Sequence, residues 1–208
     1  NESGGVDFEE MRGGIVYSWN WGSFGLVKDH VNWGTNYNGA NVFNDRPPSI
    51  TQLKLYMKPA KWFEFNYFHG WLVSMVIDSS NSYYYNVGNS LYYRQTYRPK
   101  YMAANMFTVK PWKKLNISFG NSIVYSDMNV HPGYLIPIMF FKAIDHTLNA
   151  NIDNQNSQMF FDISSMQIKK LHLYTTLYID ELKTSRLFDS ETHNFWSWKA
   201  GFKESNIL

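Results

Sequence analysis

Aromatic residues and side-chain amides gather in two stretches of the sequence that also contain glycine. The first stretch, residues 31–44, contains Trp33, Tyr37 and Asn38. The second, residues 81–97, contains Tyr83, Tyr84, Tyr85, Tyr92 and Tyr93. Carbohydrate binding needs flat rings that stack on sugar faces and amides that bond hydroxyls, so these are the candidate carbohydrate-binding residues. The more ordinary alternative is that the tyrosines pack their loops against the protein or against a neighbour.

Residues suited to acid–base, nucleophilic or metal chemistry do not occur in a matching arrangement. Asp29–His30 and Asp145–His146 are adjacent pairs, and neighbours on a strand point to opposite faces, so neither pair forms a catalytic dyad. The chain has no cysteine, which excludes disulfides, thiolate metal sites and a cysteine nucleophile. The acidic residues lack the spacing of a calcium loop. We therefore expect no enzyme activity, no catalytic residues, no metal and no cofactor.

The basic residues concentrate in segments that resemble tight turns. Lysines occur there at positions 58, 61, 110, 113, 114, 169 and 170. They could contact phosphate-bearing lipid headgroups, or they could simply keep tight turns solvated. The whole chain has 19 Lys and Arg against 17 Asp and Glu, for a net charge of +2, and this balance argues against a nucleic-acid partner.

The composition fits a soluble surface poorly. Charged residues make up 17% of the 208 residues and aromatic residues 18%, whereas soluble surfaces want about 25–35% charged residues. The sequence has no apolar run of about 18 residues, so we expect no transmembrane helix. It begins with Asn1 and shows no signal peptide, which suggests a processed product or a piece of a longer protein.

Hydrophobic residues alternate with small polar residues, and this period of two is typical of strands with one apolar face. In residues 115–125, Leu115, Ile117, Phe119, Ile123 and Tyr125 share one face, which only Asn121 interrupts. The alternation predicts nine strands, at residues 14–21, 24–30, 50–57, 62–68, 101–109, 115–125, 158–163, 171–179 and 195–203. A short helix is expected near residues 139–148.

Short turns alternate with long connections along the chain. The long connections are residues 31–49, 70–100, 126–157 and 183–194. Alternating strands of about ten residues, joined in this way, predict an all-β fold: an antiparallel transmembrane β-barrel. The polar strand faces carry Ser, Asn, Gly, Thr and Tyr, which suit a hydrated lumen better than an open surface. We expect residues 1–208 to form a single barrel segment; a soluble β-sandwich or a lipocalin-like barrel is the alternative.

Several motifs resemble the Wzi-like capsule-assembly family of outer-membrane proteins, particularly its Bacteroidetes relatives. The resemblance rests on a Trp-Gly-x-x-Tyr-x-Gly loop, a strand led by proline, and a Lys-Pro turn into an aromatic strand. These motifs lie at residues 33–39, 46–55 and 58–70, with weaker matches at 101–107, 134–137 and 177–182. The resemblance implies a barrel of about eighteen strands, of which this chain would supply about half.

The resemblance further implies a non-catalytic protein of the Gram-negative outer membrane that helps to assemble or retain capsular polysaccharide. The implied partners are outer-membrane lipid, surface polysaccharide and other outer-membrane proteins. Two alternatives stay open. The chain could be an accessory barrel subunit that docks in a larger outer-membrane complex, or a diffusion porin with an open lumen.

Overall fold

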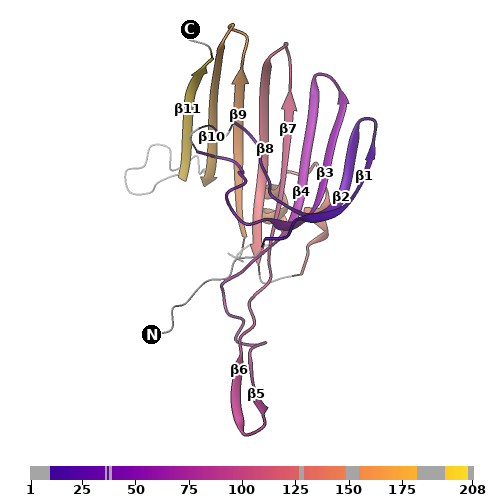
Figure 1. Ribbon diagram of the computed structural model, residues 1–208, viewed down its shortest axis with the longest axis vertical. Helices are drawn as coiled ribbons and strands as arrows, with labels where there is room; N and C mark the ends of the chain where they lie inside the picture. The colour runs from indigo at the N-terminus through magenta and orange to yellow at the C-terminus, as the bar shows by residue number, and fades with distance from the viewer. Residues whose placement is uncertain are drawn as a thin grey trace.

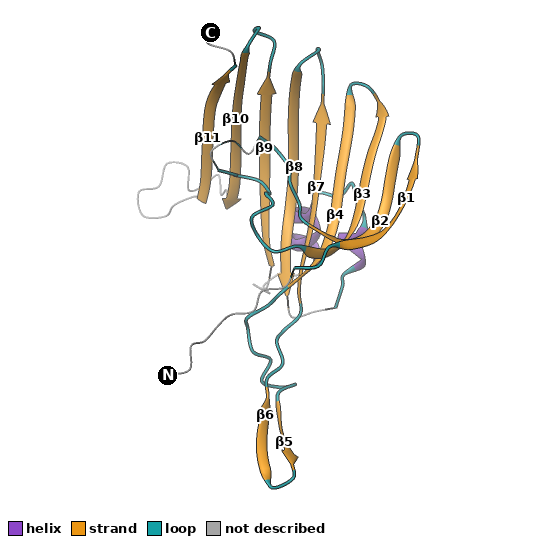
Figure 2. Cartoon of the chain, in the orientation of Figure 1, coloured by secondary structure: helices purple, strands orange, loops and turns teal. Residues whose placement is uncertain are grey.

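The computed structural model describes residues 10–35, 37, 39–126, 129–148, 155–181 and 195–205, and nine of its strands form one antiparallel sheet. The order is β1-β2-β3-β4-β7-β8-β9-β10-β11, so each strand pairs with its neighbours along the chain (Figures 1 and 2). The strands are β1 (Gly13–Trp19), β2 (Gly22–Asp29), β3 (Ile50–Ala60), β4 (Phe63–Leu72), β7 (Lys100–Val109), β8 (Leu115–Ser126), β9 (Gln155–Ser165), β10 (Leu171–Glu181) and β11 (Phe195–Glu204). Each strand expected from the alternation overlaps one of these, and the all-β antiparallel prediction is confirmed.

The connections differ in length between the two ends of the sheet. Residues 20–21, 61–62, 110–114 and 166–170 form short turns at the upper end in Figure 1, and the long connections lie at the lower end. Pro59 falls inside β3 but within a register shift, between the pairs Met57–Phe65 and Ala60–Phe63. Because proline has no N–H to donate, a break in the ladder is where a strand tolerates it.

The strand register places most large apolar side chains on one side of the sheet. Leu55 lies opposite Tyr67, Phe65 opposite Phe107, and Phe119 opposite Phe161. We call this side the apolar face. Large side chains remain exposed on it from one edge of the sheet to the other. They are Ile15, Tyr17, Phe24, Leu26, Ile117, Phe119, Phe161, Ile163, Leu173, Trp196, Trp198 and Phe202.

The opposite side, which we call the polar face, carries mostly small, amide and charged residues on the alternate positions, together with a few large ones such as Phe68, Met106 and Phe160. Ser122 donates to Gln158, Thr108 and Ser118 share a hydrogen bond, and Thr176 donates to Asp162 across neighbouring strands. All of these side chains are buried. Their hydrogen bonds compensate for the loss of water contacts, so the polar face is ordered by a side-chain network.

The connection at residues 126–157 is more structured than the predicted long loop. It contains a 3-10 helix, η1 (Pro132–Leu135), and α1 (Phe141–Leu148), which confirms the helix expected near residues 139–148. Tyr134 and Phe141 are fully buried against Phe65, Ala103 and Ile123. Those three belong to the apolar face, so this segment covers part of that face, behind the sheet in Figure 2.

Polar residues that interrupt the apolar face lie beneath this segment. Asn105 donates to the carbonyls of Pro137 and Met139 at 2.8 Å, and Asn121 accepts from the N–H of Phe141 at 2.9 Å. His69 bonds the hydroxyl of Tyr125 at 2.6 Å. Asn121, the one interruption in the apolar alternation of its strand, therefore holds the covering segment.

The connection at residues 70–100 also departs from the predicted loop, because it contains a second, two-stranded sheet. Its strands are β5 (Tyr83–Val87) and β6 (Ser90–Arg94). Gly88, in the tight turn between them, has φ +61°, a conformation that glycine adopts without strain. The expected long connection at 183–194 lies outside the described residues. Among the described residues, no helix has both the length and the apolar character needed to cross a bilayer.

We predict that Asn121→Ala loosens the segment from Pro132 to Leu148. The substitution removes the acceptor of the Phe141 N–H and a donor to Asn105, and leaving such buried groups unpaired costs about 1–3 kcal/mol of unfolding free energy. Denaturant unfolding in detergent, with limited proteolysis near residue 139, measures the effect. Asn116→Ala, on the polar face of the same strand, is the control; equal losses for both variants would contradict the anchoring role.

Candidate functional site

The segment between β2 and β3 lies across the polar face, and we call its described residues, 31–35, 37 and 39–49, the strap (Figure 2). Trp33 fixes its first part. The N–H of Trp33 donates to the carbonyl of Phe43, and the indole packs against Phe43, Phe68 and Phe160. A side chain at Gly120 would meet the Phe160 ring at 2.3 Å, so glycine makes room for this aromatic cluster.

Charged groups of distant strands hold the next part of the strap. The carboxylate of Asp162, on β9, accepts from the N–H of Thr35 at 3.1 Å and from its hydroxyl at 3.3 Å. Lys199, on β11, donates to the carbonyls of Thr35 and Gly39. Gly34 has φ +83°, which lets the chain turn just before these contacts. The strap therefore crosses the polar face from β2 as far as β11.

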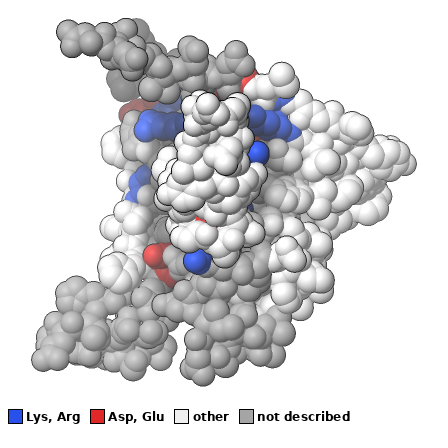
Figure 3. Space-filling model, turned by 90° about the horizontal axis from the view of Figure 1, so that it is seen from below, with Lys and Arg blue, Asp and Glu red and all other residues white. Residues whose placement is uncertain are grey.

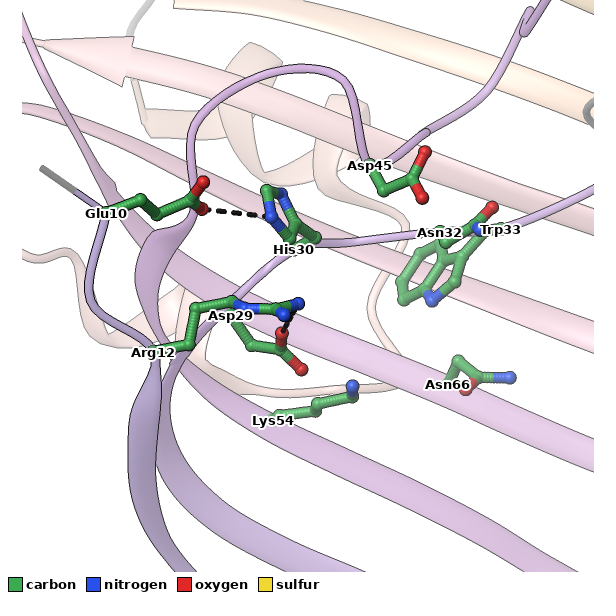
Figure 4. Close-up of a pocket in the computed structure, with 9 residues that line it drawn as sticks. All are labelled: Glu10, Arg12, Asp29, His30, Asn32, Trp33, Asp45, Lys54 and Asn66. Atoms are coloured by element: carbon green, nitrogen blue, oxygen red, sulfur yellow. Dashed lines mark ion pairs between the residues drawn. The ribbon is translucent and has the colours of Figure 1, made fainter. Parts of the chain in front are cut away.

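The strap leaves one polar hollow of about 600 Å³ toward β2, β3 and β4 (Figure 4). Asp29, Lys54 and Asn66 line it from the sheet. Glu10 pairs with His30 at 2.9 Å, and Arg12 pairs with Asp29 at 3.7 Å. Burial alone would raise the pKa of Glu10, but hydrogen bonds from Ser49 and the charges of His30 and Arg12 hold it below its ordinary value. Glu10 is therefore a carboxylate at neutral pH.

A second polar hollow, of about 510 Å³, lies on the other side of the strap, and Asn32 lines both. Its sheet side carries Glu64, Asp162 and Lys110. Glu64 forms ion pairs with Lys110 at 2.5 Å and with Lys58 at 2.6 Å. Both hollows thus present positive and negative groups together, and hydrogen-bonding side chains line them.

A serine and a histidine also meet beside the second hollow. The hydroxyl of Ser164 and Nε2 of His172 lie 2.7 Å apart, and the Tyr37 ring packs edge-on against the imidazole. Nucleophilic catalysis needs a third group that orients the histidine. Within the described residues no carboxylate bonds His172, and no three His, Asp or Glu residues gather as metal ligands. Asp29 and His30 have separate partners, as their adjacency on a strand predicts.

The two predicted carbohydrate-binding stretches lie in different places. Trp33 is 7% exposed, and its ring faces are covered by the aromatic cluster under the strap. Tyr37 is on the strap and contacts His172 and Tyr174. Asn38 lies outside the described residues. The first stretch therefore offers a sugar the exposed part of Tyr37 rather than a stacking platform.

The five tyrosines of the second stretch are brought together on the β5–β6 hairpin. Tyr84 packs on Tyr93 with ring centroids 4.7 Å apart, Tyr85 stacks on Tyr92 at 5.9 Å, and Tyr83 contacts Tyr85. All five are exposed. The hairpin extends away from the lower end of the large sheet in Figure 1. Seen from below in Figure 3, a mostly uncharged surface projects toward the viewer, with patches of Lys and Arg beside it.

The sequence patterns did not assign a role to the residues that hold the strap. Asp162, Glu64 and Lys199 are charges on the polar strand faces of a chain in which charges are scarce. That scarcity is the signal that could have identified them. The sequence does not show which residue each charge contacts, since Asp162 and Thr35 are 127 residues apart.

Comparisons with known proteins leave the family unassigned. No family model matches the sequence, and no curated protein matches it. Among solved structures, the chain matches the NanC porin in a rhombohedral crystal form with a TM-score of 0.44 and 11% identity, covering 94% of this chain and 92% of that chain. A similarity of this size establishes neither family nor activity. The resemblance to the Wzi-like family stays a prediction.

We predict that acid loosens the base of the tyrosine hairpin through Asp78. Its carboxylate accepts from the hydroxyl and N–H of Ser80 and from the side chain of Asn81, and these hydrogen bonds hold its pKa below the ordinary value. Since the folded pKa is the lower one, the stabilisation is present above about pH 4 and is lost as the pH falls through the folded pKa.

The measurement is the NMR shift of the Ser80 and Asn81 amides in an acid titration. Asp78→Asn is the matched control, because the amide keeps an acceptor oxygen but does not titrate in this range. If the amide shifts of the wild type and of this variant move alike, Asp78 is not the titrating group.

Proposed function

We propose that the chain forms the wall of a Gram-negative outer-membrane β-barrel whose lumen, narrowed by the strap, lets small hydrophilic solutes pass. The observation that carries the proposal is the opposite character of the two faces of one sheet. A broad apolar face remains exposed, while the other face carries a hydrogen-bonded polar network. Lipid around the apolar face and water against the polar face would give each face a compatible environment.

The dimensions of the sheet support a bilayer around the apolar face. Seven of its strands have 10 to 12 residues, and a spanning β-strand needs about 9–11. Tryptophans lie at both strand ends. Trp62 and Trp112 are exposed at the short turns, and Trp71 and Trp196 are exposed at the opposite end. Tryptophan favours the two membrane interfaces, so these positions suit aromatic girdles.

The strap supports passage of small polar solutes rather than a sealed wall. It crosses the polar face but leaves a hollow on each side, and both hollows are lined by groups of both charge signs. Mixed charges favour water and hydrated solutes over apolar ligands. The edge strands β1 and β11 each pair on one side within the described residues, so a closed barrel requires that both edges pair with each other or with further strands.

We predict that the purified protein forms channels in planar lipid bilayers, and that Asp162→Ala combined with Lys199→Ala raises the single-channel conductance. The pair of substitutions removes the contacts that hold Thr35 and Gly39 while leaving the net charge unchanged. The strap then lies less tightly across the polar face, and the opening widens. Single-channel recording in salts of large and small ions measures the change.

Lys61→Ala combined with Glu204→Ala is the matched control, because it also leaves the net charge unchanged and neither residue contacts the strap. Its conductance should equal that of the wild type. Absence of channels from wild-type protein that resists heat unfolding in detergent would contradict a conducting lumen. Equal conductance of all three proteins would contradict the role of the strap.

A second candidate function, association with surface polysaccharide, is supported by the exposed tyrosine hairpin. Its rings lie at the end of the sheet that carries the long connections, which is the extracellular end in outer-membrane barrels. Tyr84 and Tyr93 pair on one face of the hairpin, and Tyr85 and Tyr92 stack on the other. Each face thus offers exposed rings beside hydroxyls, a surface suited to pyranose rings. Retention of capsular polysaccharide would then use the hairpin rather than the strap.

We predict that Tyr84→Ser combined with Tyr93→Ser weakens binding to a panel of extracted capsular polysaccharides by about tenfold, because both rings of one pair are lost. Binding is measured by titration calorimetry on the detergent-solubilised protein. Tyr97→Ser is the control, because Tyr97 is exposed but lies outside the stacked pairs. Unchanged binding in the double variant, or no binding by the wild type, would refute the role.

A further inference from the structure

A third hollow, at the short-turn end of the polar face, is lined by four lysines. Its volume is about 380 Å³, and the lysines are Lys114, Lys169, Lys170 and Lys203. None of the described residues that line it is acidic. We propose that this hollow is a binding site for a phosphate-type oxyanion, carried by a soluble solute or by a lipid headgroup.

The backbone at two of these lysines has a conformation that is unusual for a residue with a side chain. Lys114 has φ +64° and Lys170 has φ +66°, and they are the two residues other than glycine with positive φ in the described chain. A side chain in this left-handed region costs conformational free energy that glycine avoids. Both positions nevertheless carry lysine, and both line the same hollow.

Hydrogen bonds between neighbouring turns fix the positions of these two lysines. The carbonyl of Lys114 accepts from the N–H of Met166 at 2.8 Å, which joins the β7–β8 turn to the β9–β10 turn. The carbonyl of Lys170 accepts from the N–H of Ser205 at 2.9 Å, just after β11. Three connected strand ends therefore bring the lysines together before any ligand binds, and such preorganisation lowers the cost of binding.

The fourth lysine approaches from the polar face. The ammonium of Lys203 lies over the Tyr37 ring, 4.8 Å from its centroid. Tyr37 and His172 line both this hollow and the second polar hollow beside the strap, so the two adjoin. The nearby carboxylates of the second hollow are already engaged, Glu64 by two lysines and Asp162 by Thr35 and Thr176. An oxyanion in this hollow would lie beside four lysines and would not compete with these carboxylates.

The test is to titrate the full chain, in dodecyl maltoside, with inorganic phosphate. The lysines are dimethylated with an isotope label, and the NMR shifts of their methyl groups are measured. The wild type should show saturable shifts. Lys114→Gly combined with Lys170→Gly should weaken phosphate binding at least about tenfold while the melting temperature stays the same or rises, because glycine relieves both left-handed positions. If Lys114 and Lys170 had a purely structural role, the double glycine variant would change in melting temperature but would bind phosphate as the wild type does.

A second variant, Lys169→Ala with Lys203→Ala, removes two charges without relieving the backbone and should also weaken binding. Lys61→Ala, at the same end of the sheet but outside the hollow, should bind as the wild type does. Nanodiscs with and without phosphatidylglycerol form the second arm; a response confined to this arm supports the site and identifies the headgroup as the source. No response in either arm, or equal losses in the Lys61 variant, would overturn the proposal. The lysine shifts can be measured whether or not the lumen conducts. Failure of the phosphate site is therefore distinguishable from failure of the channel proposal.

Discussion

The apolar face of the sheet is the constraint on which the rest of the structure depends. Side chains such as Ile15, Phe119 and Phe202 are exposed on it, although apolar side chains gain about 25 cal/mol per Å² when they leave water. A soluble sandwich would bury this face against a second sheet. In the described chain only the segment with η1 and α1 covers it, and that cover extends over β4, β7 and β8 as far as β9. In the proposed barrel, lipid covers the remainder of this face.

The polar residues of this face have hydrogen-bond partners, and most of those partners belong to the covering segment. Lipid offers no hydrogen bonds, so an unpaired amide on a lipid-facing strand is costly. Asn105, Asn121 and His69 sit where the segment from Pro132 to Phe141, or Tyr125 beneath it, supplies partners. The exposed positions farther across the same face, such as Phe161 and Leu173, are apolar. The buried amides and the histidine of this face thus lie where the segment from Pro132 to Phe141 covers it.

Sequence alternation predicted the strands well because register and periodicity are local properties. All nine strands of the large sheet were predicted, and the ends differed by a few residues. The hairpin was missed although Gly88-Asn89 between two aromatic runs is a recognised turn signal. The strap and the cover could not be predicted, because their positions depend on contacts such as Thr35 with Asp162, which no local pattern encodes. Trp33 resembled an exposed platform in sequence, and only the packing of Phe43, Phe68 and Phe160 around it shows that it is buried.

Because charged residues are scarce in this chain, the positions of the charged side chains indicate their roles. Asp162 and Lys199 hold the strap, and Glu64 lies between Lys58 and Lys110 at the short-turn end of the polar face. These carboxylates are thus neutralised by the protein itself. The lysines of the third hollow differ, because two of them occupy left-handed backbone positions and no acidic residue of the described chain lines that hollow. Four lysines are therefore concentrated at one end of the polar face, and the proposed anion would bind there without displacing the groups that hold the strap.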